Sequence, residues 1–488
     1  MDTARPLREG LARLRIGRRR LAGLLGGALA GALWRAGPAA AWSDSQGNLV
    51  NVKDFGAVGD GAHDDQPWVS AAFGAIAGRG GVLYFPPGTY RFAGNGGRTG
   101  PRFDTSNLTI QGAGPASRIL LDSDITAISV QGTPREHLKG VVVRDLAIVG
   151  ARSGSSPGMH FGYVDEVVVR DCQIEAVGAD RAGAYGSNGI QLQDCDGAVV
   201  TTCRIGACGY NGIELRDARN VTITTTTVEK CGANGILVTG ASDGFLVANN
   251  RLVGNGRNPD GSGREGRTGV NVSDATAMPN VGVIASNYLD NNGDHGILII
   301  CWRGGHADLS DATFKSIVIT GNTVVNHRNW ANGSAGIQIE QGKNCTVSGN
   351  ALWNNYQGVN LYNSGDCTVS GNDIKAASRF GILVAGSVRA AISGNLVANS
   401  GSIEQGHGID VRALSSPTTG CTFTGNRVFG SAGQDVNVQE PNVGNVLLGN
   451  ITSKPILDLN SPGANTYGEN VVSDKLGAYP VEAGDRTG

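Results

Sequence analysis

The chain has 488 residues, of which 40% are hydrophobic and 17% are charged, and its formal net charge is −2 at pH 7. This balance argues against a nucleic-acid partner, because a protein that follows a phosphate backbone needs a strongly basic face. The length allows two or three ordinary domains or one long repeat structure. The chain contains 76 glycines and 16 prolines, which indicates many tight turns in which glycine supplies positive φ.

Residues 1–41 have the pattern of an export signal. Three arginines at 18–20 precede an apolar run at 21–34, and three alanines follow at 39–41. A basic head, an apolar core too short to span a bilayer comfortably and an A-x-A-like end are typical of such signals, and the paired arginines resemble a twin-arginine signal. We therefore expect an exported protein, periplasmic or extracellular, with no stable membrane span. A general secretory signal or a disordered basic tail is the alternative interpretation.

Residues 50–142 contain the motifs of an amino-terminal cap and first turns. The stretch DFGAVGDGAHDD at 54–65 is followed by GGVLYFPPGTY at 80–90. Asp64 and Asp65 are predicted to cap a helix, because apolar residues recur after them at helical spacing. Those apolar positions are Trp68, Ala71, Ala72, Ala75 and Ile76.

These motifs resemble the opening segment of the pectate lyase superfamily, which includes rhamnogalacturonase-like and epimerase-like proteins. The resemblance implies an all-β fold, a single-stranded right-handed parallel β-helix (solenoid) with a short N-terminal capping helix. Hydrolases, lyases, epimerases and phage tailspikes share this opening, so it selects no chemistry. We interpret Asp60, His63, Asp64 and Asp65 as cap and turn groups.

Residues 143–451 are predicted to form the repeating turns of this solenoid. The hexapeptide CTVSGN occurs at 345–350 and again at 367–372. Such a unit buries too little apolar surface to fold alone and must stack on its neighbours. Residues 452–488 are predicted to cap the last turn, whose open edge would otherwise pair with another chain. The predicted turns start at Val143, Val169, Val200, Ile223, Val247, Ile284, Ile319, Val347, Val369, Ile392, Phe423 and Leu447.

Asparagine follows each turn start by three residues from Val247 onward. Stacked turns lie roughly 4.8 Å apart, so asparagine side chains in register are expected to hydrogen-bond along the coil as a structural ladder. The ladder positions are Asn250, Asn287, Asn322, Asn350, Asn372, Asn395, Asn426 and Asn450.

The nine cysteines follow the same repeat. Cys345, Cys367 and Cys421 share one position of the turn, and Cys172 and Cys203 occupy the ladder position on adjacent turns. This spacing favours buried, stacked thiols over a metal site, since no C-x-x-C pair is present. A disulfide between Cys172 and Cys203 is the alternative that their separation allows.

Four insertions, at 175–188, 253–268, 325–335 and 398–407, fall at the same corner of the turn. We expect them to form one wall of a groove, because long loops on a rigid scaffold commonly bind ligands. Basic residues interleaved with tryptophan suit anionic sugars, since guanidinium pairs with carboxylate and indole covers a pyranose ring. The predicted substrate-binding residues here are Arg264, Arg267, Arg328 and Trp330, with Trp302 in a further insertion.

The strand after each Gly-Ile corner is predicted to turn its second and fourth residues outward. These positions form a polar strip that suits hydroxyl groups of a sugar. From it we predict Gln191, Asn271, Asn360 and Tyr362 as further substrate-binding residues.

GYNGIELRD at 209–217 is similar to the mannuronan C5-epimerase signature Y-G-F-D-P-H-E. Tyr210 matches its tyrosine, Glu214 its aspartate and Arg216 its histidine, while the family's second catalytic aspartate aligns with Thr239. The resemblance therefore indicates a location and not a mechanism. We expect Tyr210 and Arg216 to act as base and leaving-group acid, with Glu214 orienting Arg216.

A second predicted constellation comprises Asp294, His295 and Glu340, with Arg328 above it. His295 is its expected base, held by Asp294 or Glu340. Four turns, roughly 19 Å, separate Glu214 from Glu340, so the two sets are expected to be subsites of one groove rather than one catalytic centre.

These features predict an exported enzyme that acts on an acidic, uronate-containing polysaccharide by C5-proton abstraction, as a lyase or C5-epimerase. The first alternative is a polygalacturonase-like glycoside hydrolase, for which GHG is present at 406–408 but the aspartate pair and R-I-K are missing. The second is a non-catalytic carbohydrate-binding protein or adhesin. No metal or cofactor is predicted, and Ca²⁺ is the alternative, for which the sequence offers no obvious carboxylate cluster. The sequence assigns no oligomeric state.

Overall fold

The computed structural model describes residues 48–94, 100–180, 185–257, 267–274, 281–301, 314–329, 333–403, 406–473 and 475. The chain divides into two units, Met1–Asn48 and Leu49–Gly488. The predicted export signal at 1–41 lies outside the described residues. Among the described helices, none has the length and apolar character needed to cross a membrane.

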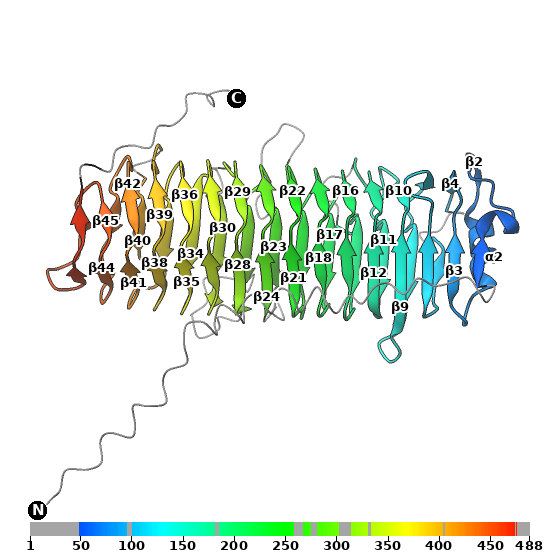
Figure 1. The fold of residues 1–488 in the computed structure, drawn as a ribbon, viewed down its shortest axis with the longest axis horizontal. Coiled ribbons are helices and arrows are strands. Elements are labelled where there is room, and N and C mark those ends of the chain that lie inside the picture. Colours follow the sequence, from blue (N-terminus) through cyan, green and yellow to red (C-terminus); the bar gives the residue numbers. More distant parts are fainter. Residues whose placement is uncertain are drawn as a thin grey trace, which may run out of the picture. The chain divides into compact units, whose positions relative to one another are not determined.

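The unit from Leu49 onward is a coil of parallel strands. Each turn adds one strand to each of three sheets, here called A, B and C, except that the first and last described turns add strands to A and B only. Neighbouring strands in a sheet come from consecutive turns. Figure 1 shows these turns side by side, from α2 at the blue end to β44 and β45 near the red end. Because every strand pairs with the turn before and the turn after, backbone hydrogen bonds are satisfied between turns rather than within one.

The described strands have the following bounds. Sheet A contains β1 (Leu49–Asn51), β3 (Gly81–Tyr84), β6 (Leu108–Gln111), β9 (Leu138–Arg144), β12 (Val164–Arg170), β15 (Val199–Thr201), β18 (Thr222–Thr224), β21 (Phe245–Ala248), β24 (Gly282–Ala285), β28 (Ile317–Thr320), β32 (Thr346–Ser348), β35 (Thr368–Ser370), β38 (Ala391–Ser393), β41 (Thr422–Thr424), β44 (Val446–Leu448) and β47 (Thr466–Gly468). Sheet B contains β2 (Asp60–Asp64), β4 (Gly88–Phe92), β7 (Ser117–Leu121), β10 (Ala147–Val149), β13 (Gln173–Glu175), β16 (Arg204–Gly206), β19 (Thr227–Glu229), β22 (Arg251–Val253), β25 (Tyr288–Asp290), β29 (Thr323–Val325), β33 (Ala351–Trp353), β36 (Asp373–Lys375), β39 (Leu396–Ala398), β42 (Arg427–Phe429), β45 (Ile451–Thr452) and β48 (Val471–Val472). Sheet C contains β5 (Arg102–Phe103), β8 (Ile128–Gln131), β11 (Met159–Gly162), β14 (Ile190–Gln193), β17 (Ile213–Arg216), β20 (Ile236–Thr239), β23 (Val270–Asp274), β26 (Ile297–Cys301), β30 (Ala335–Glu340), β34 (Gln357–Tyr362), β37 (Ile382–Ala385), β40 (Ile409–Arg412), β43 (Val436–Val438) and β46 (Leu457–Asp458). A separate pair is formed by β27 (Phe314–Lys315) and β31 (Gly342–Lys343).

The predicted all-β solenoid and its register are confirmed. All twelve predicted turn starts lie in one column of sheet A, in which Val169 pairs with Val143 and Val200, and the series continues to Leu447. These side chains point into the coil and are buried. The column extends to Ile110 before the predicted repeats and to Tyr467 after them, so regular coiling continues past residue 451.

The asparagine ladder is also confirmed. Asn322 Nδ2 donates to Asn350 Oδ1 at 2.9 Å, and Asn350 Nδ2 donates to Asn372 Oδ1 at the same distance. Each Oδ1 also accepts the backbone N–H of the preceding ladder residue. The column therefore satisfies amides that the corner would otherwise leave buried without partners.

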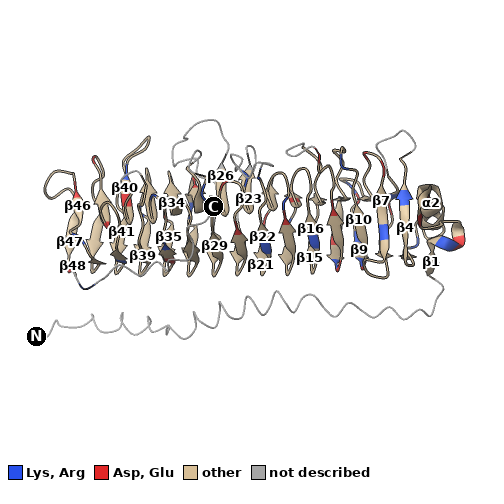
Figure 2. Ribbon diagram, turned by 90° about the horizontal axis from the view of Figure 1, so that it is seen from above, with Lys and Arg blue, Asp and Glu red and all other residues tan. Residues whose placement is uncertain are grey.

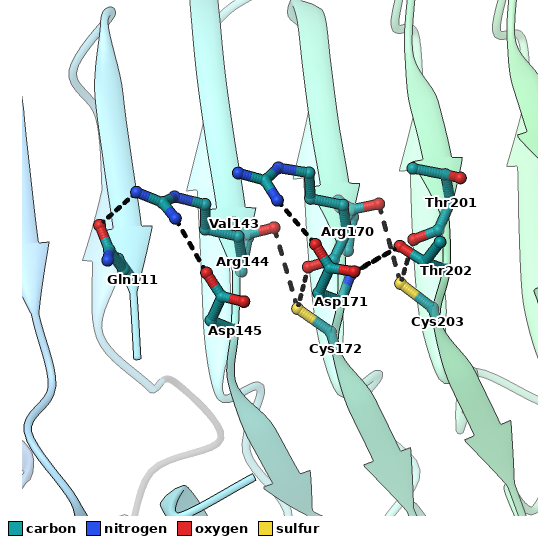
Figure 3. Close-up of polar contacts among 11 residues, drawn as sticks. Gln111, Val143, Arg144, Asp145, Arg170, Asp171, Cys172, Thr201, Thr202 and Cys203 are labelled. Carbon is teal, nitrogen blue, oxygen red and sulfur yellow. Dashed lines mark hydrogen bonds and ion pairs between the residues drawn. The ribbon is translucent and has the colours of Figure 1, made fainter. Parts of the chain in front are cut away.

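Cys172 and Cys203 occupy the ladder position on earlier turns, and both are free, buried thiols rather than a disulfide. Cys172 Sγ contacts the carbonyl oxygen of Val143 at 3.8 Å, and Cys203 Sγ contacts that of Val169 at 3.7 Å (Figure 3). Each thiol thus reaches back to the preceding turn, as a ladder asparagine does. Figure 3 also shows arginine–aspartate pairs at this corner, such as Arg170 with Asp171.

Glycine has two separate roles in the turns. The residue before the ladder asparagine has positive φ, and glycine takes this position at Gly349 and Gly371. The glycine of the Gly-Ile corner, such as Gly358, does not have positive φ. It is required because a Cβ there would lie 2.3 Å from the carbonyl oxygen of Gly381 on the next turn. Positive φ alone, the expected reason for the glycine content, accounts for only part of it.

The capping helix is α2 (Gln66–Gly74), preceded by the short 3-10 helix η1 (Val52–Phe55). Asp64 Oδ1 accepts the backbone N–H of Gln66, as predicted for a cap. The carboxylate of Asp65 makes no cap bond and instead accepts the N–H of Val58 at 2.6 Å. Trp68, predicted on the buried face, is 46% exposed. The helix is rotated from the predicted face, and its buried residues are Val69, Ala72 and Phe73, followed by Ile76 just after its end.

Charges of both signs are spread along the turns (Figure 2). This distribution agrees with the near-zero net charge, so any attraction for an ionic ligand must come from a local arrangement of side chains.

Candidate functional site

The four predicted insertions all join a strand of sheet B to the next strand of sheet C. They connect β13 to β14, β22 to β23, β29 to β30 and β39 to β40. They therefore emerge along one edge of sheet C, as expected. Two columns of side chains lie on the outer face of this sheet. They consist of the second and fourth residues of β14, β17, β20, β37 and β40, together with the residues paired with these in register on the other strands.

Glu214, on β17, is only 1% exposed although it lies in an outward-facing column. Its Oε2 accepts from Asn188 Nδ2 at 2.7 Å and from Asn211 Nδ2 at 3.4 Å. Its Oε1 accepts from Arg216 Nε at 3.1 Å and Nη2 at 2.7 Å. The direct contact between Glu214 and Arg216 agrees with the predicted role of Glu214, which is to orient Arg216. With both oxygens engaged, Glu214 is a positioning group.

Two tyrosine–arginine pairs lie above this carboxylate. Arg216 Nη2 donates to the hydroxyl oxygen of Tyr185, and Arg267 Nη1 donates to that of Tyr210 at 3.4 Å. The guanidinium carbons stand over the rings, 5.5 Å from the centroid of Tyr185 and 5.2 Å from that of Tyr210. The two ring centroids are 5.4 Å apart. Two phenol groups and two cations therefore lie close together beside β17.

Arg216 keeps its charge at this point. Burial alone would lower the pKa of Arg216, but the Tyr185 hydroxyl and the negative charge of Glu214 outweigh it, so the pKa is raised above its ordinary value. Of the predicted sugar-binding residues, Arg267 lies in the site itself, and Gln191 is paired in register with Glu214. Asn271 lies two strands further along and is buried, with its Nδ2 3.4 Å from Asn234 Oδ1, so it belongs to the amide network beneath the site.

Sequence reasoning missed Tyr185 and His160. Tyr185 lies in the 175–188 insertion, 31 residues before its partner Arg216, and only its position in one of the four insertions signalled it. His160 occupies the same outward column as Gln191, one turn earlier, and would have been found by extending the column upstream. Burial lowers the pKa of His160, and the charge of Arg216 acts in the same direction. His160 is therefore a neutral neighbour of the site at pH 7.

The second predicted constellation does not form as expected. His295 Nε2 lies 3.6 Å from Asp294 Oδ2, so the predicted partner Asp294 is present. His295 Nδ1, however, accepts the backbone N–H of Ala335 at 2.8 Å, and the side chain is buried. Burial lowers the pKa of His295 against the opposing charge of Asp294. The neutral ring then carries its proton on Nε2 and has no open acceptor for a substrate proton.

Glu340 does not hold His295, and this prediction was wrong. Ile297 pairs with Ile337, which places His295 beside Ala335 at the start of β30, whereas Glu340 is the last residue of that strand. Five residues of extended chain, roughly 16 Å, separate the two places. The prediction correctly placed the two residues on neighbouring turns. The structure shows that they lie at opposite ends of the strand.

Glu340 instead lines a cavity of about 260 Å³ with Tyr362, Gln338, Gln357 and Arg379. Asn360 is adjacent, and its Nδ2 donates to Gln338 Oε1 at 3.3 Å. The predicted binding residues therefore divide between two places on sheet C. Arg328 is exposed, and the predicted Arg264, Trp302 and Trp330 lie outside the described residues.

Within the part of the chain that the structure describes, no group of three His, Cys, Asp or Glu side chains is placed to hold a metal ion. The absence of a metal or cofactor stays a prediction.

The comparisons with known proteins agree with this architecture. The "Right handed beta helix region" family model matches residues 106–277, 157–329 and 280–445. A mannuronan C5-epimerase of Azotobacter vinelandii, AlgE5, is 35% identical over 148 residues, which are 28% of this chain and 15% of the relative. The chain thus matches only a small part of that relative's length.

Two solved structures share the fold. The A-module of the Azotobacter vinelandii mannuronan C-5 epimerase AlgE6 has a TM-score of 0.51 at 18% identity, over 87% of this chain and 99% of the module. The catalytic unit of a GH87 alpha-1,3-glucanase from Streptomyces thermodiastaticus has a TM-score of 0.59 at 18% identity, over 80% of this chain and 70% of that one. At these identities the structures agree on the fold alone. The stacked turns and the family match together place the chain in the right-handed β-helix family.

Proposed function

We propose that the protein is a polysaccharide-modifying enzyme that acts on a uronate-containing polysaccharide by abstracting the C5 proton, as a lyase or C5-epimerase. The observation that carries the proposal is the pair of adjacent tyrosines, whose hydroxyl oxygens each accept a hydrogen bond from a different arginine. Export to the periplasm or the cell exterior is part of the same proposal. The partial similarity to a mannuronan C5-epimerase supports the substrate class.

Neutralisation of the uronate carboxylate is the first requirement of this chemistry. The C5 proton becomes acidic only when the neighbouring carboxylate no longer repels the developing negative charge. Arg216 and Arg267 supply two guanidinium groups beside the tyrosines, and guanidinium binds carboxylate through paired hydrogen bonds. Glu214 fixes Arg216 from beneath, so the cation is already in place when the sugar binds.

Proton transfer is then assigned to Tyr185 and Tyr210. One tyrosyl oxygen, as phenolate, takes the C5 proton and leaves the electron pair on the carboxylate-stabilised carbon. In a lyase this pair forms the C4–C5 double bond as the C4–O bond breaks, and the second tyrosine protonates the departing oxygen. In an epimerase the second tyrosine returns a proton to the opposite face of C5. Either outcome needs two acid–base groups at one sugar, which the two rings provide.

The glycoside hydrolase alternative is less well supported by the geometry. Hydrolases of most families place two carboxyl groups roughly 5 to 10 Å apart. Along the described outward columns from β11 to β40, the carboxylates are Glu214, Glu340 and Asp410, on β17, β30 and β40. Even the closest two are three strands apart, roughly 14 Å.

The test is a screen of the purified protein against polymannuronate and polygalacturonate. Growth of the ultraviolet band of an unsaturated uronide marks a lyase, and C5 hydrogen–deuterium exchange in D₂O without that band marks an epimerase. Tyr210→Phe and Tyr185→Phe are each expected to lower kcat about 100-fold or more. Arg267→Gln is expected to raise KM more than it lowers kcat.

Tyr288→Phe is the matched control, because Tyr288 also pairs with an arginine, Arg251 at 4.8 Å from its ring, but on sheet B. It should retain full activity. New reducing ends without either uronide signal would replace this proposal by the hydrolase. Binding without any turnover would replace it by a carbohydrate-binding or adhesin role. Full activity in both active-site phenylalanine variants would remove the tyrosines from the mechanism.

A further inference from the structure

The acid–arginine pair of β17 is built a second time on β40. Glu214 and Arg216 are the second and fourth residues of their strand, and Asp410 and Arg412 take the same places in theirs. Arg412 Nε donates to Asp410 Oδ2 at 2.6 Å, and Asn437 Nδ2 donates to Asp410 Oδ1 at 2.7 Å. Asp410 is fully buried, as Glu214 nearly is.

The fold itself does not require this pair. A buried ion pair is costly to desolvate, and well-packed apolar residues often replace one without loss of stability. Sheet C already uses less polar combinations at the same two positions on the strands between. These are Leu237 with Thr239, Leu298 with Ile300, and Leu383 with Ala385. The buried carboxylate is therefore best explained by what it does to the arginine, which is to fix its guanidinium at the surface.

The surroundings of Arg412 hold the guanidinium in one orientation. Phe380 lies outside the main core, packed on Leu383 and Ala385. The guanidinium carbon of Arg412 is 4.6 Å from the ring centroid of Phe380, and that of Arg379 is 4.8 Å from it. Among the described residues, the Asp410 carboxylate is the hydrogen-bond partner of the Arg412 side chain, through Nε. The Arg412 side chain is 24% exposed, so its Nη groups are available to a ligand.

The adjoining cavity defines what such a ligand must be. Arg379 and Tyr362 line the cavity, with the amides of Gln338 and Gln357. Two guanidinium groups suit a carboxylate, while the amides and the phenol suit sugar hydroxyls. Glu340 lines the β30 side of the cavity and repels an anion there, which directs the carboxylate toward β37 and β40.

We propose that Arg412 and Arg379 form a second carboxylate-binding subsite, which holds an anionic sugar of the polysaccharide far from the reactive one. The identity of this ligand rests on the proposed function. Seven strand steps of sheet C separate β17 from β40, roughly 34 Å. One long polysaccharide chain reaches both places, whereas a trisaccharide occupies only one. The second subsite therefore increases affinity for long chains without touching the reacting sugar.

The experiment is calorimetric titration with mannuronate and galacturonate trisaccharides and with the corresponding polymers. The unaltered protein should bind two equivalents of the preferred trisaccharide, and the double variant Asp410→Asn with Arg412→Gln should bind one. The double change avoids leaving a buried carboxylate without its cation. Affinity for the polymer should fall about tenfold or more, while turnover of the trisaccharide stays unchanged.

Arg389→Gln is the control, because Arg389 pairs with Asp366 in an exposed ion pair at another corner. Thermal unfolding of each variant verifies that the coil is intact, and Arg412→Lys provides a second variant that keeps the charge but loses the paired N–H geometry. The inference would be overturned if the double variant still bound two equivalents of trisaccharide. It would also be overturned if neither trisaccharide showed a bound equivalent that is lost when Arg412 is replaced. An Arg412-dependent equivalent without turnover of any polymer would sustain it while refuting the proposed chemistry.

Discussion

The guanidinium group of Arg216 donates two hydrogen bonds to a single oxygen of Glu214, and two asparagine amides occupy the other oxygen. Glu214 is therefore satisfied on both sides while almost completely buried. A carboxylate in this state is poorly placed to remove a proton from a sugar. Its effect on catalysis must come through Arg216, whose position it fixes.

Replacing Arg216 and replacing Glu214 should lower the free energy of unfolding by different amounts. Arg216→Gln leaves the Glu214 carboxylate buried without its cation and is expected to lower the free energy of unfolding by about 3 kcal/mol. Glu214→Gln leaves Arg216 free to turn to solvent and should cost less, but should lower turnover about 100-fold because the cation is misplaced. Urea unfolding and initial rates on the preferred polyuronate measure the two effects. Equal stability losses would mean that Glu214 is less enclosed than its contacts indicate.

The ladder makes a separate prediction about Asn350. Asn350 Oδ1 accepts both the N–H and the Nδ2 of Asn322, so Asn350→Ala leaves the buried N–H of Asn322 without its acceptor, while Nδ2 keeps the carbonyl oxygens of Ile284 and Thr320. We expect a loss of about 2 to 3 kcal/mol in the free energy of unfolding. Asn350→Thr should cost less, because Thr226 already fills a ladder position and its Oγ1 accepts the N–H of Cys203. Asn354→Ala, on the same turn but half-buried, should cost about 1 kcal/mol, because it removes one hydrogen bond to Asn326 Oδ1 and places alanine at φ 56°.

The repeat register was predictable because it depends on local patterns. Alternating burial recurs along the strands, and the fixed offset between Val347 and Asn350 recurs in every turn from Val247 to Leu447. One misplaced residue would invert the faces of a strand. The ladder and the edge where the loops emerge followed from this register. Both are set by spacing within a turn, which the sequence displays directly.

The partners within the site were less predictable, because they depend on where side chains lie along neighbouring strands. His295 and Glu340 were correctly placed on adjacent turns. The register, however, places His295 beside Ala335, the first residue of β30, whereas Glu340 is its last residue. Tyr185 reaches Arg216 from an insertion whose path no repeat specifies. Contacts made by loop residues thus needed the structure, whereas contacts made by strand residues mostly did not.

The corner glycine of the turn supports a prediction about close packing between turns. A Cβ at Gly358 would lie 2.3 Å from the carbonyl oxygen of Gly381 and 2.6 Å from a methyl group of Ile374. Gly358→Ala should therefore lower the free energy of unfolding by about 1 to 3 kcal/mol, because the backbone of the next turn must move. Gly74→Ala is the control, since a Cβ there meets no atom within 4 Å and lies at the end of α2. A neutral Gly358→Ala would show that the turns have more freedom than this spacing implies.

His327 occupies an asparagine position in a second buried column, between Asn292 and Asn355. Asn292 Nδ2 lies 3.1 Å from His327 Nε2, and His327 Nδ1 lies 3.1 Å from Asn355 Oδ1. These contacts fit a neutral ring that accepts at Nε2 and donates from Nδ1. Burial lowers the pKa of His327 to about 3. Protonation would convert the acceptor into a donor facing the donor amide of Asn292.

This lowered pKa predicts a loss of stability in acid. Below pH 6.5 the unfolded chain takes up a proton that the folded chain refuses until about pH 3, so the contribution of His327 is complete above pH 6.5 and falls between these values. The loss from this group is about 2 kcal/mol at pH 5. His327→Asn should remove that part of the slope in a pH series of urea unfolding. His160, His295 and His407, whose pKa values burial also lowers, should retain a smaller slope in the His327→Asn variant. An unaltered slope in that variant would mean that the acid sensitivity resides in those other histidines.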